Sequence, residues 1–275
     1  MSGAAAAPAR AVPGNGGFGD GYDWAALVAR MLALAALLAI WQWIPASIVP
    51  EYAVSRPGAT FRALWAMLVD GSLVLNLAGS LKGLFLGIAI GAPVGIALAL
   101  LLRVPILSWV LDPLVTLGNA IPKVALISFF ILWLGLSSQA HLALVLSFVV
   151  FIFCYNTRQA IDEVDPHRLT MLRLAGASRL QVIRLLTFPS SIPYLLAAVR
   201  IAVPLAFAVQ VFAELRVPVK YGMGCLLGKS AEGMDGAGTM SVLIVVAAVG
   251  YLFDIVIGKR LSNYAQRVGA AGTTL

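Results

Sequence analysis

Charged residues are scarce in this sequence. Its 275 residues include 19 Lys and Arg and 12 Asp and Glu, which together make 11%. A soluble domain carries about 25% charged residues, so a water-soluble enzyme is nearly excluded. Apolar residues make 61% of the chain, and a mean hydropathy of +0.95 also excludes a soluble body with a single anchor. We expect an all-α polytopic membrane protein.

Cysteine and histidine are equally rare. Cys154 and Cys225 fit no metal or disulfide pattern, and His141 and His167 are isolated from each other. The apolar segments contain no Ser/His/Asp set, carboxylate pair or metal-ligand spacing. We therefore expect a non-catalytic chain without a metal or a cofactor. We attribute the net charge of +7 to membrane topology and not to nucleic acid binding.

Long apolar runs take the place of the missing charge. A membrane-spanning helix takes about 20 apolar residues, and the sequence holds six candidate segments. They cover residues 24–44, 77–102, 104–136, 140–155, 192–212 and 240–257. The third segment is too long for one upright span, and Pro122 divides it, so we predict a long broken helix. A short interfacial helix is expected at 59–69, and a Gly-rich loop before Gly238.

Positive charge predicts the orientation of these six spans. The N-terminal tail, the turn at Arg103, the 156–190 loop and the C-terminus hold ten Lys and Arg, whereas the opposite loops hold five. Because cytoplasmic loops carry the excess of Lys and Arg, we expect both termini in the cytoplasm. Reading the third segment as two separate spans would export the Arg-rich loop. The expected divisions are a disordered cytoplasmic tail (1–22), the first span with its extracytoplasmic connection (23–76), a core (77–267) and a C-terminal tail (268–275).

Glycine recurs at every fourth residue of the second span. Such a face lets another helix backbone approach closely, so we predict a packing surface, within the chain or across a dimer. Its residues are Gly83, Gly87, Gly91 and Gly95. Arg200 and Asp254 lie in the fifth and sixth spans at similar depth, and we predict a structural ion pair between them.

Lys123 follows the proline that breaks the third segment. Ionisable residues within a membrane usually face a partner or a pathway, and no opposite charge lies at similar depth. Freed backbone groups at a break are tolerated where they line protein or a water-filled cavity. We therefore predict a translocation pathway at this break, and Lys123 favours an anionic substrate. Its predicted lining is Asn119, Pro122, Lys123 and Ser128, with Gln210 and Glu214 as the facing wall.

The stretch 156–190 is the longest polar segment. Asp165, followed by proline, predicts the N-terminus of a helix, and Gly176 is typical of the residue that ends one. Ser178 can cap a second short helix, which we expect Pro189 to close. The apolar side chains that this elbow presents are Leu169, Met171 and Leu172. They can lie on the membrane or insert into a soluble partner.

The elbow resembles the cytoplasmic signature of the permease subunits of bacterial ABC importers. That signature reads Glu-Ala-Ala, three residues, Gly, nine residues, and Ile-x-Leu-Pro. Gly176 and Pro189 match it at the right separation, whereas Thr170, Met171 and Leu172 occupy the Glu-Ala-Ala positions. Further motifs are similar to the branch that imports nitrate, sulfonates, taurine and related compounds. They are Ser80 with Lys82, 121–127, 131–135, Arg200, Ala213 with Glu214, and 221–224.

The resemblance implies the six-span permease core of the smaller importer class in the bacterial inner membrane. Its implied partners are a cytoplasmic ABC ATPase dimer, an extracytoplasmic substrate-binding protein and a second permease copy. The chain would couple ATP hydrolysis by its partner to alternating access for a small anionic solute. We assign ATPase coupling to Arg168, Thr170, Met171, Leu172, Arg173, Gly176 and Pro189. A secondary transporter, which needs paired midplane charges and related halves, and a membrane-embedded enzyme are the alternatives.

Overall fold

The computed structural model describes residues 24–43, 50 and 52–271, with side chains described up to residue 258. The predicted tail at 1–22 lies outside the described residues. The chain forms two compact units that divide after Pro45. The first contains α1 (Trp24–Trp43), an apolar helix of 20 residues with tryptophan at both ends, as is typical of the two interfaces of a membrane.

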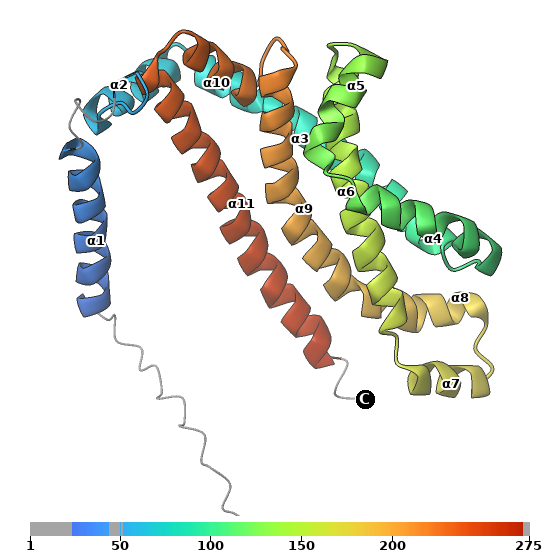
Figure 1. The fold of residues 1–275 in the computed structure, drawn as a ribbon. Helices are drawn as coiled ribbons and strands as arrows, with labels where there is room; N and C mark the ends of the chain where they lie inside the picture. Colours follow the sequence, from blue (N-terminus) through green and yellow to red (C-terminus); the bar gives the residue numbers. More distant parts are fainter. Residues whose placement is uncertain (1–23, 44–49, 51, 272–275) are drawn as a thin grey trace, which may run out of the picture. The chain divides into compact units, whose positions relative to one another are not determined.

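Within the described residues of the second unit the regular elements are all helices, joined by short turns, which confirms the predicted all-α class (Figure 1). In chain order its elements are α2 (Pro57–Val69), α3 (Ser72–Leu101), α4 (Pro105–Ala120), the 3₁₀ turn η1 (Lys123–Ala125), α5 (Leu126–Leu134), α6 (Ser138–Asp162), α7 (Pro166–Leu174), α8 (Arg179–Val182), the π-helical turn η2 (Ile183–Thr187), α9 (Phe188–Arg216), α10 (Met223–Glu232) and α11 (Gly236–Ala271).

The described helices bear out the six candidate spans. Five of them are long and apolar enough to cross a membrane, and the pair formed by α4 with η1 and α5 makes the sixth if it counts as one span. This pair bends by 82° around Pro122, because the proline favours extended backbone in Ile121, the residue before it. The break that the sequence predicts is therefore close to a right angle.

Helix α6 packs against both α3 and α9, and α11 packs against α9 and α2. The glycine face of α3 lies within the chain. A Cβ at Gly91 would come within 2.8 Å of Val149 Cγ1, and one at Gly95 within 2.9 Å of Phe153 Cβ. Gly87 lies similarly against Val145 of α6, whereas Gly83 faces the side chain of Gln210 of α9; these contacts let α3 lie close to both neighbours.

Two expectations about this part of the chain are wrong. Pro189 does not close a helix, since the chain continues from α8 through η2 into α9; the wider π-helical turn before the proline gives its ring room. The Gly-rich loop before Gly238 contains α10, whose N-terminus is held by side chains of other helices. The sixth span agrees with the prediction of 240–257, since Gly236–Gly258 is the part of α11 that is apolar enough to cross a membrane, and the helix continues to Ala271.

Candidate functional site

The elbow begins with α7, which local hydrogen bonds hold at both ends. Asp165 Oδ1 accepts a hydrogen bond of 2.8 Å from the backbone N–H of His167, as predicted for an N-cap. At the other end, Gly176 has a φ of +78°, and the N–H of Ala177 donates to the carbonyl of Leu172 over 3.0 Å. The left-handed glycine and this bond form a Schellman motif, so Gly176 sets the angle at which the chain leaves α7.

The second arm of the elbow starts at Ser178. The N–H of Ser178 donates to Gln181 Oε1 over 2.7 Å, and the Gln181 N–H donates back to Ser178 Oγ over 3.4 Å. This reciprocal capping box confirms the predicted cap. Because the helix continues from Arg179 to Arg216, the second arm is the first part of a long helix and not a separate loop.

Several apolar side chains of the elbow are exposed. Met171 is 69% exposed, Leu174 84% and Leu180 74%, whereas Leu169 and Leu172 are half-buried. Leu174 and Leu180 were not predicted from the sequence to be exposed here, whereas the predicted Leu172 is half-buried. Leu174 could have been predicted, since it follows Met171 by three residues and so lies on the same face of a helix.

The inner surface of the elbow is hollowed and basic. A hollow of about 570 Å³ is lined by Arg173, Ala177, Arg179, Val182 and Ile183. Of the other predicted coupling residues, Arg168 lies 3.6 Å from Asp165, measured between Nε and Oδ2. The Thr170 hydroxyl donates to the carbonyl of Pro166, so it is satisfied within α7.

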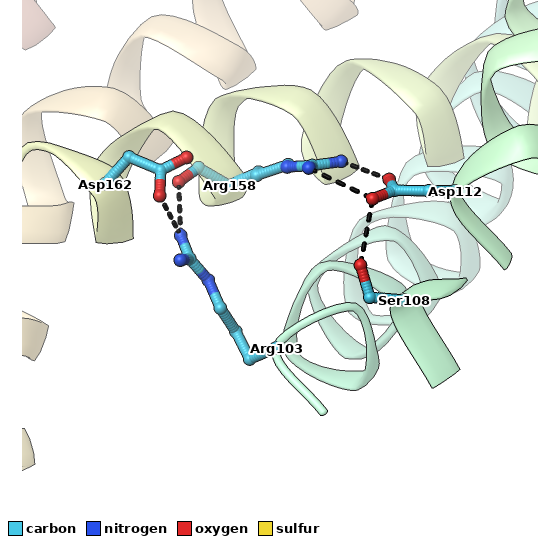
Figure 2. Close-up of polar contacts among 5 residues, drawn as sticks. All are labelled: Arg103, Ser108, Asp112, Arg158 and Asp162. Carbon is cyan, nitrogen blue, oxygen red and sulfur yellow. Dashed lines mark hydrogen bonds and ion pairs between the residues drawn. The ribbon is translucent and has the colours of Figure 1, made fainter. Parts of the chain in front are cut away.

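A charge network ties α4 to the end of α6 that leads into the elbow (Figure 2). Both oxygens of Asp112 accept hydrogen bonds from the guanidinium of Arg158, and Asp112 Oδ2 also accepts from Ser108 Oγ over 2.9 Å. Arg103, in the turn after α3, donates to Asp162 Oδ1 over 2.8 Å and to the carbonyl of Arg158 over 3.0 Å. A bidentate arginine–carboxylate pair fixes orientation as well as distance. This network was not predicted from the sequence, because Asp112 and Arg158 are 46 residues apart in the chain.

Lys123 is the first residue of η1, and its side chain packs against α6. Its ammonium donates to the carbonyl of Asn119 over 3.0 Å and to Asn119 Oδ1 over 2.9 Å. It also lies 5.0 Å from the ring centroid of Phe151 and 5.9 Å from that of Phe148. These partners carry no charge, so the charge pattern of the sequence does not predict them. Ser128, one turn further on, is exposed.

Gln210 and Glu214 do not face Lys123 and belong to a separate buried cluster. Glu214 is 2% exposed; its carboxyl group accepts from Ser80 Oγ over 2.6 Å, from Gln210 Nε2 over 2.9 Å and from the Gly224 N–H over 3.0 Å. Ser80 Oγ accepts in turn from the N–H of Met223 over 2.8 Å. The predicted facing wall is therefore a hydrogen-bonded junction of α3, α9 and α10.

Two further bonds fix the segment between α9 and α10. The N–H of Gly222 donates to Asn76 Oδ1 over 2.8 Å, and His141 Nε2 lies 2.8 Å from the carbonyl of Val217. Side chains of α3 and α6 thus satisfy backbone groups of this segment, and side chains of α3 and α9 hold the first N–H groups of α10, which lack partners within that helix. This is the reason that a Gly-rich stretch forms a helix here.

Arg200 and Asp254 lie within ion-pair distance, with 3.8 Å between Arg200 Nε and Asp254 Oδ1. Both side chains are more than half exposed. The pair joins α9 to α11. Gly258 lies against the same guanidinium, with an added Cβ 3.3 Å away.

The sequence is similar to those of curated transport permease proteins. The taurine transport system permease protein TauC of Escherichia coli (strain K12) is 24% identical over 233 residues, which cover 81% of this chain and 83% of TauC. The nitrate import permease protein NrtB of Leptolyngbya laminosa is 24% identical over 237 residues, covering 82% and 84%. The putative aliphatic sulfonates transport permease protein SsuC of Escherichia coli (strain K12) is 26% identical over 242 residues, covering 84% and 89%.

Solved structures share the fold. A chain of a bacterial ABC transporter involved in the import of the acidic polysaccharide alginate aligns with a TM-score of 0.63 and 16% identity, over 87% of this chain and 98% of that chain. A chain of the inward-facing MetNI methionine ABC transporter aligns with a TM-score of 0.57 and 20% identity, over 72% and 97%. The family model described as "Binding-protein-dependent transport system inner membrane component" matches residues 87–263, more than half of the chain. The chain therefore belongs to this family and is a permease of the ABC importer type.

Proposed function

We propose that this permease imports a small anionic solute, driven by ATP hydrolysis on a cytoplasmic ABC ATPase dimer. An extracytoplasmic substrate-binding protein delivers the solute, and two copies of the chain form the translocation unit. Support comes from the family, which is named for binding-protein-dependent transport, and from relatives named for taurine, aliphatic sulfonates and nitrate. Each of these three named solutes carries an anionic group.

The elbow is the proposed contact with the ATPase, and its exposed apolar surface is the observation that carries the proposal. Met171, Leu174 and Leu180 are each at least two-thirds exposed, although burial of such side chains is strongly favourable. A contact that transmits force must also be stiff. The capped ends of α7 and the unbroken helix from Arg179 to Arg216 provide that stiffness.

The charge network links the elbow, through the end of α6, to α4, which is the first half of the broken span. Helix α7 follows α6 after a short connection, so a movement of α7 also moves the end of α6. At that end, Arg158 binds Asp112 of α4. Helix α4 leads to the 82° bend beside Lys123. We propose that the ATPase moves the elbow and that the Arg158–Asp112 pair passes this movement to the break, where Asn119, Pro122, Lys123 and Ser128 line the pathway.

We propose that the elbow and both termini face the cytoplasm. The ten Lys and Arg on that side, against five on the other, support this orientation. The Glu214 cluster and α10 then lie toward the extracytoplasmic side, where the binding protein delivers its solute. In this orientation Gln210 and Glu214 lie at the outer end of the proposed pathway and not opposite Lys123.

A matched pair of methionine variants tests the proposed ATPase contact. Met171, in α7, is 69% exposed, and Met234, between α10 and α11, is 71% exposed. The permease is purified with its cognate ATPase and binding protein, and both ATPase retention and stimulated hydrolysis are measured. We expect Met171→Asn to lower both quantities and Met234→Asn to change neither, because only Met171 lies on the elbow. Equal effects of the two variants would remove the elbow from the interface.

A further inference from the structure

The hollow of about 570 Å³ lies between the two arms of the elbow. Arg173 lines it from the last turn of α7, and Arg179 lines it from the start of α8. These arginines stand three residues before and three residues after Gly176, so each arm contributes one guanidinium group. The other lining residues are apolar, namely Ala177, Val182 and Ile183. All the charge of the hollow is therefore positive.

The two guanidinium groups have no carboxylate partner within the described part of the chain. Residues 164–190 contain four arginines and a single carboxylate, that of Asp165. Asp165 caps α7 and lies 3.6 Å from Arg168. Arg173 and Arg179 take part in none of the ion pairs among the described residues, and both side chains are exposed. A concave site with charge of one sign attracts groups of the opposite sign.

An anionic group in the hollow would act on the angle of the elbow. Arg173 and Arg179 belong to arms that meet at the left-handed Gly176. Two like charges repel each other across this turn, whereas a carboxylate between them attracts both. Arginine also presents its N–H donors in a planar fork that fits a carboxylate. Such a group therefore holds α7 and the second arm together, which a contact that transmits force requires.

The surroundings of the hollow favour an acidic side chain of a protein. Val182 and Ile183 form an apolar wall, and Ile183 is 54% exposed, so the methylene groups of a glutamate or an aspartate can pack there beside the carboxylate. Arg173 is followed in the chain by Leu174, which is 84% exposed and belongs to the proposed ATPase contact. The hollow is thus continuous with that contact.

We infer that the cytoplasmic ATPase inserts an acidic side chain into this hollow, where its carboxylate lies between Arg173 and Arg179. This inference rests on the proposed function, because it gives the chemistry of the partner that meets the elbow. The ATPase surface that faces the elbow is then acidic, and its carboxylate bridges the two arms across Gly176.

Three arginine variants test the inference in one titration. The cognate ATPase is titrated onto the permease in phosphatidylcholine nanodiscs, which contain no anionic lipid. Arg173→Gln and Arg179→Gln are each expected to weaken ATPase binding by about tenfold, equivalent to about 1.4 kcal/mol. Arg184→Gln is the matched control and should change nothing, since Arg184 is an exposed arginine of the second arm that does not line the hollow.

Two results of the titration would overturn the inference. Equal losses in all three variants would mean that the ATPase responds to the overall charge of the elbow and not to the hollow. A loss that appears only when phosphatidylglycerol is added to the nanodiscs would assign the hollow to a lipid phosphate.

Lysine variants test the chemistry of the inserted group. A carbodiimide joins a lysine ammonium directly to a carboxylate as an amide, without a spacer. Arg173→Lys and Arg179→Lys keep the positive charge and are each expected to cross-link to an Asp or Glu of the ATPase, which mass spectrometry of the linked peptides identifies. Arg184→Lys should not cross-link to the ATPase. If neither hollow variant cross-links to the ATPase, or if Arg184→Lys does so with equal yield, the inference is wrong.

The outcomes separate this inference from the proposed function. If Met171→Asn weakens ATPase binding while Arg173→Gln and Arg179→Gln do not, the elbow remains the ATPase contact and the acidic side chain is refuted. If the hollow variants behave as expected in a complex that shows no ATP-dependent uptake of any small anion, the proposed import function is wrong and the site remains.

Discussion

Gly176 allows the mechanical role of the elbow to be tested at one residue. Its φ is +78°, and a Cβ added there would meet nothing within 4 Å. The whole cost of a side chain therefore comes from the backbone, about 1–2 kcal/mol for a left-handed residue other than glycine. Since 1.4 kcal/mol is a factor of ten, Gly176→Val should shift the elbow about tenfold away from its Schellman geometry without disturbing any packing contact.

The expected result is a loss of coupling in a protein that still folds. Gly176→Val should lower ATPase retention and the hydrolysis stimulated by loaded binding protein, while the yield of permease in the membrane stays near wild type. Gly176→Asn should retain most of both activities, because asparagine tolerates the left-handed conformation. Gly250→Val controls for a bulky residue at another open position, since a Cβ at Gly250 also meets nothing within 4 Å.

The decisive comparison is between valine and asparagine at Gly176. If both variants couple as well as wild type, the left-handed turn is not needed for the ATPase contact and the coupling assignment is wrong. If both fail equally, a property of glycine other than its φ is responsible. Hydrogen exchange at the Ala177 amide, which donates to Leu172, reports whether the Schellman motif has opened.

Three further predictions concern packing, coupling and the pathway. Gly95→Leu should lower the free energy of unfolding of the detergent-solubilised permease by about 1–3 kcal/mol or more in thermal unfolding, because a Cβ there meets α6. Gly250→Leu should not lower it. Equal stability of the two variants would mean that α3 and α6 are further apart. Asp112→Asn should reduce stimulated ATP hydrolysis, and the exchange of Asp112 with Arg158 should restore part of it; no recovery would count against a transmitting pair. Lys123→Ala should lower uptake of an anionic solute and leave assembly intact; unchanged uptake would limit Lys123 to its contacts with α6.

Features that depend on neighbouring residues were predictable from the sequence. Asp165 and Ser178 act through bonds to residues two or three positions away, and the φ of Gly176 is a property of the turn itself. Long apolar runs similarly predict spans, because each span satisfies its backbone internally. The elbow and the number of candidate spans were therefore accessible without a structure.

Features that depend on distant partners were not predictable in the same way. Ser80 and Glu214 are 134 residues apart, and the bonds of Gly224 and Met223 to them turn a Gly-rich stretch into α10. Motif resemblance selected these residues without showing that they meet. The neutral partners of Lys123 and the π-helical turn that lets a helix continue through Pro189 carry no sequence pattern that we could read.

Uptake into proteoliposomes tests the central claim most directly. The permease is reconstituted with its ATPase, ATP is placed on the ATPase side, and the binding protein is added on the other side with labelled taurine, nitrate or an alkanesulfonate. The account predicts accumulation of at least one of these anions against its gradient, dependent on both ATP and the binding protein. Accumulation driven by an ion gradient without ATP, or no ATP-dependent accumulation of any of them, would contradict the account.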